Sequence, residues 1–194
     1  MNENSGRGHS GLPPVPTEWV PGRGPDKCDC MIVGEAPGRQ EWTAKRPFFK
    51  DAPAGGLLRS ELEAAGLTAV IEECIYITNV VKVFPPIDDG RTSKKLKPTE
   101  AQIAAAMWFL EAEIRYYRPK HVLALGATAI KTLTGSCRTI KHAREHPRDL
   151  VSHFGHSARV IPTYHPSYIC CRPGGEDKLR DFQEDLRQFI RACI

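Results

Sequence analysis

The chain has 194 residues, a length that suits one domain with a sizeable hydrophobic core. Its composition, 41% hydrophobic and 26% charged residues, is typical of a soluble globular protein. No apolar run approaches the roughly 18 residues that a membrane-spanning helix needs, which argues against a membrane protein. The net charge of +4 is modestly basic, so the distribution of charge matters more than its sum.

Residues 1–26 are rich in glycine and proline and lack the apolar core of a signal peptide. They predict a flexible or extended arm in front of a domain over residues 27–194, and they favour a cytoplasmic protein. The seven cysteines are an odd number at irregular positions. This pattern fits reduced thiols better than a framework of disulfides.

Four short apolar runs, typical of buried parallel strands, alternate along the chain with segments of helical periodicity. The runs are CMIV (30–33), CIYIT (74–78), HVLAL (121–125) and RVIPT (159–163), and the helical segments cover 55–66, 98–117, 126–135 and 176–190. Within 98–117, Thr99 and Gln102 have the spacing of a capping box. The alternation predicts an α/β fold, a three-layer α/β/α sandwich around a mainly parallel four-stranded sheet.

A special turn follows each predicted strand: GEAPG (34–38), NVVK (79–82), GATA (126–129) and YHPSY (164–168). In an open parallel sheet, ligands bind beyond the carboxyl ends of the strands. Glu35, Asn79 and His165 are therefore expected to converge on one edge of the sheet. Each of these residues taken singly is a weak signal, because a lone histidine or asparagine is more often structural.

Segment 82–98 is basic, has no periodicity and is too long for a simple connector. Charge alone leaves two readings open, a solvated loop and a surface that contacts phosphates.

The blocks GEAPG, KRPFF with PAGGLL, YITNVVK, LALGATA and VIPTYHPSY occur in this order. Together they resemble the uracil-DNA glycosylase superfamily, most closely its family four, from about residue 28 onwards. The resemblance implies a monofunctional DNA glycosylase, which flips a pyrimidine out of the helix and leaves an abasic site. It also implies single- or double-stranded DNA as partner, a monomer and no membrane association.

The resemblance assigns roles residue by residue. His165 donates a hydrogen bond to the anion that develops on the base, and Glu35 orients or activates the attacking water. Phe48 stacks on the flipped base, whereas neighbouring Phe49 is the better candidate for a core residue. Asn79 reads the polar edge of the base. The expected substrate-binding residues are Gly34, Ala36, Gly38, Phe48 and Asn79.

The expected DNA contacts follow from the basic segment and from the last block. Thr139 and His142 are assigned a further phosphate contact together with Lys141. Tyr168, Ile169 and Arg172 correspond to the loop that enters the duplex in relatives. The full set of expected DNA-binding residues is Lys82, Lys94, Lys95, Lys141, Ser167, Tyr168, Ile169 and Arg172.

Family four usually carries an iron–sulfur cluster on four cysteines, but the corresponding positions here are Val83 and Ala106, and the early pair is only Cys28-x-Cys30. The sequence therefore predicts neither cluster nor other cofactor. A metal site is not expected either. His142 and His146 have no third ligand in view, and Cys170–Cys171 lacks a C-x-x-C partner pair.

The excised base stays open at this level. Lys45 and Lys50 replace two family glycines beside Phe48, in a longer and more cationic wall. Uracil is the first expectation, and a 5-substituted or glucosylated pyrimidine of phage DNA, removed in antiviral defence, is the alternative. A non-catalytic DNA-binding protein is a second alternative. A nucleotide-binding α/β protein is disfavoured because the phosphate-loop motif is missing.

Overall fold

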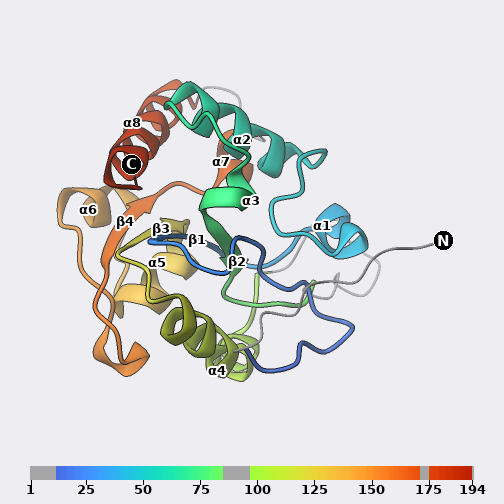
Figure 1. The fold of residues 1–194 in the computed structure, drawn as a ribbon. Helices are drawn as coiled ribbons and strands as arrows, with labels where there is room; N and C mark the ends of the chain where they lie inside the picture. The colour runs from blue at the N-terminus through green and yellow to red at the C-terminus, as the bar shows by residue number, and fades with distance from the viewer. Residues whose placement is uncertain (1–11, 85–96, 171–174, 194) are drawn as a thin grey trace, which may run out of the picture.

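The sheet at the centre of the molecule is seen in a computed structural model, which describes residues 12–84, 97–170 and 175–193 (Figure 1). Its strands are β1 (Cys30–Gly34), β2 (Tyr76–Asn79), β3 (His121–Leu125) and β4 (Arg159–Thr163). They lie in the order β2-β1-β3-β4, and every neighbouring pair is parallel. All four strands therefore end at the same edge of the sheet.

Helices cover both faces of this sheet, which confirms the expected α/β/α sandwich (Figure 1). Helices α4 (Glu100–Tyr117) and α5 (Ala127–Thr134) lie on one face, and α2 (Pro53–Ala64) and α8 (Glu176–Cys193) lie on the other. None of the described helices has the length and apolar character needed to cross a membrane. The shorter helices are α1 (Arg39–Ala44), α3 (Ile71–Cys74), α6 (Ile140–Glu145), α7 (Pro166–Cys170) and the 3₁₀ helix Ser152–Phe154.

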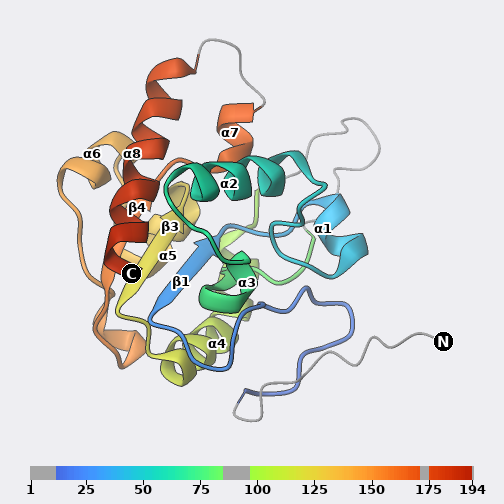
Figure 2. The same cartoon turned by 45° about the horizontal axis from the view of Figure 1, so that its top comes forward.

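The buried strands explain why two cores form. Side chains alternate between the faces of a strand, so a strand covered on both sides is apolar throughout. In β1, Met31 and Val33 belong to the core beneath α4 and α5, whereas Cys30 and Ile32 belong to the core beneath α2 and α8. Figure 2 shows β1 running toward the side of the molecule that carries α1 and α7.

The helix and strand boundaries follow the sequence pattern closely, with one shift. Residues 71–74 form helix α3, so the second strand begins at Tyr76 and not at Cys74, as was expected. The capping box is confirmed, because the Gln102 N–H donates to Thr99 Oγ1 (3.2 Å) and the Thr99 N–H donates to Gln102 Oε1 (2.9 Å).

The described part of the N-terminal arm lies against β2 and α4. Trp19 packs on the rings of Trp108 and Phe109, with centroids 5.9 and 5.5 Å away. The Arg23 N–H donates to the Ile77 carbonyl (2.8 Å), and the Ile77 N–H donates back (2.7 Å). The division of the chain into an arm and a domain stays a prediction.

The cysteines differ from the expectation of reduced thiols. Cys30 in β1 and Cys193 in the last turn of α8 form a disulfide. The two residues are 163 positions apart, so their spacing gave no sign of the pair. Cys28, Cys74 and Cys137 are free thiols.

Replacing Cys193 with Ser is expected to lower the free energy of unfolding by about 2–4 kcal/mol, because a cross-link over a long loop restricts the unfolded chain. Urea unfolding without reductant measures this loss, and Cys74→Ser, which removes a free thiol, is the matched control. A peptide map of unreduced protein that finds Cys30 and Cys193 as free thiols would contradict the pairing.

Candidate active site

Gly34 is the point at which the candidate site is assembled. It ends β1 and lies opposite Asn79, the last residue of β2. A Cβ at Gly34 would overlap the Asn79 Oδ1 atom and the Phe48 ring. The missing side chain therefore lets an amide and an aromatic ring come together at the carboxyl edge of the sheet.

Asn79 brings an unusual polar group to this edge. Its side chain is buried (2% exposed), yet neither amide atom has a hydrogen-bond partner among the described residues. Buried polar groups are nearly always paired, and leaving one unpaired costs about 1–3 kcal/mol. An orphaned amide at a sheet edge is therefore a candidate for ligand recognition.

His165 lies next to the same ring. Its imidazole centroid is 5.7 Å from that of Phe48. Gly126 has a φ of +88°, which favours glycine, and a Cβ there would lie only 3.1 Å from the His165 Cβ. Both the backbone conformation and the close packing of His165 therefore favour glycine at this turn. The Ser167 N–H donates to His165 Nδ1 (3.2 Å), and the Ser167 Oγ lies 2.7 Å from it. A neutral ring that accepts at Nδ1 carries its hydrogen on Nε2.

Glu35 is held by the segments on either side of β1. The Thr128 hydroxyl, at the start of α5, donates to Glu35 Oε2 (2.5 Å). The Val81 N–H donates to the Glu35 carbonyl (3.0 Å). The carboxylate is half-buried and oriented by a hydroxyl that sequence reasoning did not single out, although it lies in the GATA turn.

Glu41 is a second residue that sequence reasoning missed. This carboxylate is 8% exposed and accepts the N–H groups of Gly38 and Phe48, each at 2.5 Å. Phe48 has a φ of +47°, a conformation unusual for a bulky residue. Glu41 therefore ties the GEAPG turn to the aromatic ring. The only hint in the sequence was its position three residues after Gly38, a capping-box spacing.

Two of the expected base-binding residues differ from expectation in detail. Ala36 packs its methyl group in the core beneath α4, so it presents main chain at the turn. The Gly38 N–H is taken by Glu41, and Gly38 begins α1 with an ordinary φ of −79°. Phe48 is 1% exposed while Phe49 is half-buried, so burial does not mark Phe49 as the core residue of the pair, and the stacking role of Phe48 stays a prediction.

The predicted phosphate contact at Lys82 is wrong. The side chain is fully buried and its Nζ pairs with the Glu113 carboxylate at 2.6 Å, so it cannot reach DNA. Lys94, Lys95 and Arg172 lie outside the described residues, and their assignment stays a prediction.

The block around His165 also forms differently from the expected loop. Tyr168 and Ile169 lie on the short helix α7, and Ile169 packs against the core beneath α2. The N–H groups of Ser167 and Tyr168 both bond to His165, so they are not available to hold a phosphate. Within the described part of this block, only the exposed Ser167 side chain and the half-buried Tyr168 ring remain candidates for DNA contact.

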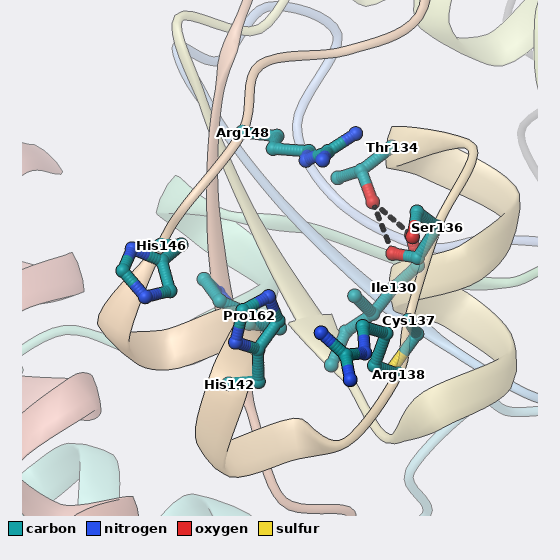
Figure 3. A pocket seen from close by; sticks show the side chains of 10 residues that line it. Ile130, Thr134, Ser136, Cys137, Arg138, His142, His146, Arg148 and Pro162 are labelled. Carbon is teal, nitrogen blue, oxygen red and sulfur yellow. Dashed lines mark hydrogen bonds between the residues drawn. The ribbon is translucent and has the colours of Figure 1, made fainter.

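Lys141 is exposed on α6, and another part of this helix lines a small hollow of about 50 Å³ (Figure 3). Arg138, His142, His146 and Arg148 line this hollow. The Thr139 hydroxyl caps α6 by accepting the His142 N–H at 3.0 Å, and its contact with a phosphate stays a prediction. The cationic lining is suited to an anion such as a phosphate.

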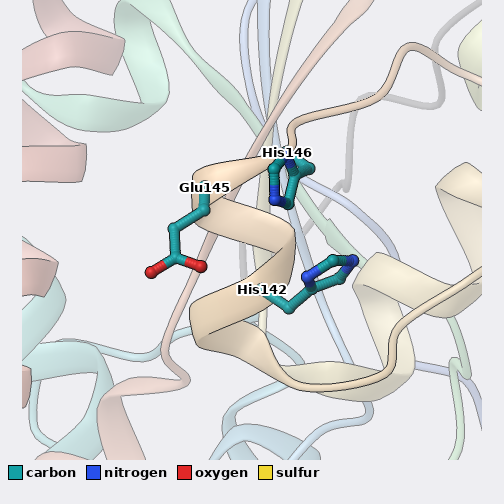
Figure 4. Close-up of side chains that lie close together, drawn as sticks. All are labelled: His142, Glu145 and His146. Atoms are coloured by element: carbon teal, nitrogen blue, oxygen red, sulfur yellow. The ribbon is translucent and has the colours of Figure 1, made fainter.

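The expectation that His142 and His146 have no third ligand nearby is wrong. Glu145 lies beside them, and one candidate ligand atom from each residue falls within 4.8 Å of the others (Figure 4). Glu145 and His146 are exposed, and Arg138 and Arg148 line the hollow that the histidines share. Two guanidinium groups beside the imidazoles oppose binding of a dication.

The described residues do not fit a four-cysteine iron–sulfur cluster. Val83 is half-buried against the core beneath α4, and Ala106 is buried in it. Cys30 is bonded to Cys193. A cluster of this kind needs four thiolates, and these positions cannot supply them.

The fold is that of an α/β protein, and its described residues form a candidate ligand site beyond the carboxyl ends of the parallel strands. Comparison with known proteins identifies the class: residues 21–190 match the model of the uracil DNA glycosylase superfamily. The Type-4 uracil-DNA glycosylase of Thermotoga maritima is 35% identical over 92% of this chain and 80% of its own length. The Type-4 uracil-DNA glycosylase of Pyrobaculum aerophilum is 34% identical over 88% of this chain and 81% of its own length. The Type-5 uracil-DNA glycosylase of the same organism is 31% identical over 80% of this chain and 68% of its own length.

The chain therefore belongs to the uracil DNA glycosylase superfamily, as its sequence blocks predicted. The match covers the whole site assembled around Gly34, from the turn that carries Glu35 to the block that carries His165.

Glu41→Gln is expected to loosen the tie between the turn and Phe48, because one of the two N–H donors would face an amide NH₂ group. Leaving a buried donor unpaired should cost about 1–3 kcal/mol of unfolding free energy. Thermal unfolding measures the loss, with exposed Glu63→Gln on α2 as the matched control. Equal stability of the two variants would show that the Glu41 contacts contribute nothing.

Proposed function

We propose that this protein is a DNA glycosylase that flips a pyrimidine, first of all uracil, out of DNA and hydrolyses its N-glycosidic bond. The observation that carries this proposal is the buried Asn79 amide, without a partner among the described residues, beside a Phe48 ring whose centroid lies 5.7 Å from that of His165. A pyrimidine has a flat face for an aromatic ring and a polar edge for an amide. Membership of the superfamily supports the same reaction.

In the proposed reaction, the bond between C1′ and N1 breaks and its electron pair leaves with the base. Negative charge develops on the base O2, where the Nε2–H of His165 donates a hydrogen bond. A preorganised donor at a developing charge is often the largest single contribution to catalysis. The Ser167 N–H supports this role, because its bond to Nδ1 selects the tautomer with hydrogen on Nε2.

Glu35 acts on the other side of the broken bond. Its carboxylate orients the attacking water, accepts its proton, and stabilises the positive charge on the sugar. The Thr128 hydroxyl supports this assignment by fixing one carboxylate oxygen. The second oxygen then remains for the water.

DNA is the substrate of this class of enzyme, and the protein side of the contact is a proposal. Lys141 and the cationic hollow that its helix lines in part would bind backbone phosphates, since such contacts dominate affinity for DNA. We also propose a monomer that works in the cytoplasm, where its substrate would lie. Reduced cysteines would favour the cytoplasm, but the Cys30–Cys193 disulfide removes that support.

One contact weighs against the alternative of a bulky phage base. Lys45 and Lys50 were both expected to meet the hydroxyls of such a base, but the Lys45 Nζ lies 3.7 Å from the centre of the Trp42 ring. The Lys45 ammonium group already has a favourable interaction with the aromatic face, so it has less to gain from the hydroxyls of a base. Lys50 is exposed and is the remaining candidate for such a contact.

His165→Ala and Glu35→Gln are expected to fold normally and to lose most excision activity. Removing one oxyanion donor typically costs about 10²–10³-fold in rate. Single-turnover excision from a uracil-containing oligonucleotide measures the loss, with His156→Ala as a histidine control away from the site. Rates near wild type in both site variants would remove the catalytic assignment.

A panel of oligonucleotides with different bases tests the choice of substrate. Uracil is expected to be released, and thymine, 5-hydroxymethyluracil, 5-hydroxymethylcytosine and its glucosylated form are not. Alkaline cleavage at abasic sites reads out each base. Release of only the bulky bases would replace repair by the antiviral alternative, and release of none would leave a DNA-binding protein.

A further inference from the structure

The direction of the Asn79 amide is set from an unexpected source. Neither amide atom has a hydrogen-bond partner among the described residues, so no hydrogen bond from them fixes where the group points. Its direction depends on the main chain at the end of β2. The residues that hold this main chain therefore influence how Asn79 recognises a base, a role that rests on the proposed function.

Lys82 binds the Asn79 main chain directly. Its Nζ donates to the Asn79 carbonyl at 2.6 Å, to Thr78 Oγ1 at 2.5 Å and to Glu113 Oε2 at 2.6 Å. An ammonium group has three N–H donors, and all three are used. The Lys82 and Glu113 side chains are both 0% exposed.

Glu113, on α4, completes this group of contacts. Its Oε1 accepts the Tyr76 hydroxyl at 2.8 Å, and the Thr78 hydroxyl donates to the same carboxylate at 3.0 Å. Burial lowers the pKa of Lys82, and the Glu113 carboxylate opposes that shift. We name these four residues, Tyr76, Thr78, Lys82 and Glu113, the β2 clamp.

The clamp and the Asn79 amide lie on opposite faces of β2. Side chains alternate along a strand, so Tyr76 and Thr78 share one face and Ile77 and Asn79 the other. Tyr76 packs in the core beneath α4 and Ile77 in the core beneath α2, which fixes the two faces. The clamp therefore holds the strand end from one face and makes no contact with the face that carries the amide.

Stability alone does not account for a buried ion pair here. Desolvating two charges costs several kcal/mol per ion, and well-packed apolar residues of similar volume are often equally or more stable. What an apolar pair cannot supply is the donor that Lys82 gives to the Asn79 carbonyl, because an apolar side chain has no N–H or O–H group. The ion pair therefore provides a fixed position for Asn79 rather than a gain in packing.

We propose that Lys82 and Glu113 are positioning residues for base recognition, which act by holding the Asn79 main chain so that its amide meets the base. They touch neither base nor sugar. Their effect on excision passes through Asn79.

A double-mutant cycle tests this route. The neutral pair Lys82→Met/Glu113→Gln keeps an acceptor for Tyr76 and Thr78 but removes the donor to the Asn79 carbonyl. In single-turnover excision of uracil it is expected to cost about tenfold or more, but less than about threefold when Asn79→Ala is already present, since residues in one network are not additive. Equal losses in both backgrounds would mean that the pair acts through the fold, and the inference would fail.

The exposed ion pair between Glu100 and Lys131 is the matched control. Its atoms are 2.8 Å apart and its side chains are 81% and 60% exposed. Lys131→Met/Glu100→Gln makes the same chemical change and is expected to leave excision within about twofold of wild type, because exposed pairs contribute little.

Amide hydrogen exchange provides a readout that needs no activity. In the neutral pair variant, exchange at residues 78–83 is expected to quicken by about tenfold while β3 stays unchanged, because local opening is governed by local contacts. Unchanged exchange at residues 78–83 would overturn the clamp, whichever base the enzyme removes. Wild-type protein that releases no base would overturn the proposed function instead, and with it the role in recognition.

Discussion

The close approach of Asn79 and Phe48 to the main chain of Gly34 is the constraint on which the site depends. Any side chain there would push Asn79 and Phe48 apart, because both already occupy the space of its Cβ. The parallel sheet then brings the remaining groups to the same edge, since β3 and β4 end beside β1. Gly126 repeats the arrangement on the next strand, where a Cβ would press on His165. Two glycines at strand ends thus make room for one aromatic ring, one amide and one imidazole.

Buried charge holds this arrangement together. Glu41 accepts two N–H groups and Lys82 donates to a carbonyl, so each ionised side chain satisfies main chain next to a site residue. Such groups are costly to bury unless fully bonded, and bonded they are rigid. Phe48 is held at both ends, because Arg59 donates to its carbonyl at 3.3 Å while Glu41 accepts its N–H. Buried charge thus fixes the main chain around a site whose amide has no hydrogen-bond partner among the described residues.

The sequence predicted those features of the fold and site that depend on residues close together in the chain. Apolar runs and strand-end turns were enough to predict the sheet, its layers and the convergence of Glu35, Asn79 and His165. Burial of charge was not predictable, because it depends on a partner far along the chain. Lys82 was read as a surface cation, although Glu113, 31 residues away, neutralises it in the core. The same limit applies to Cys30, whose partner Cys193 is brought near only by the packing of α8 on the sheet.

The hydrogen bonds to the main chain of Asn79 and Phe48 fix the positions of these two residues, whereas other features of the site can vary. The clamp fixes the main chain of Asn79, but an amide has a donor end and an acceptor end, and no described residue chooses between them. Phe48 is fixed at both its N–H and its carbonyl, so in the proposed reaction its ring offers the same stacking face to every pyrimidine. Lys45 and Lys50 flank Phe48, one resting on Trp42 and one exposed. Discrimination between bases is therefore expected to reside in these flanking side chains, which can vary without disturbing the rigid groups that carry the chemistry.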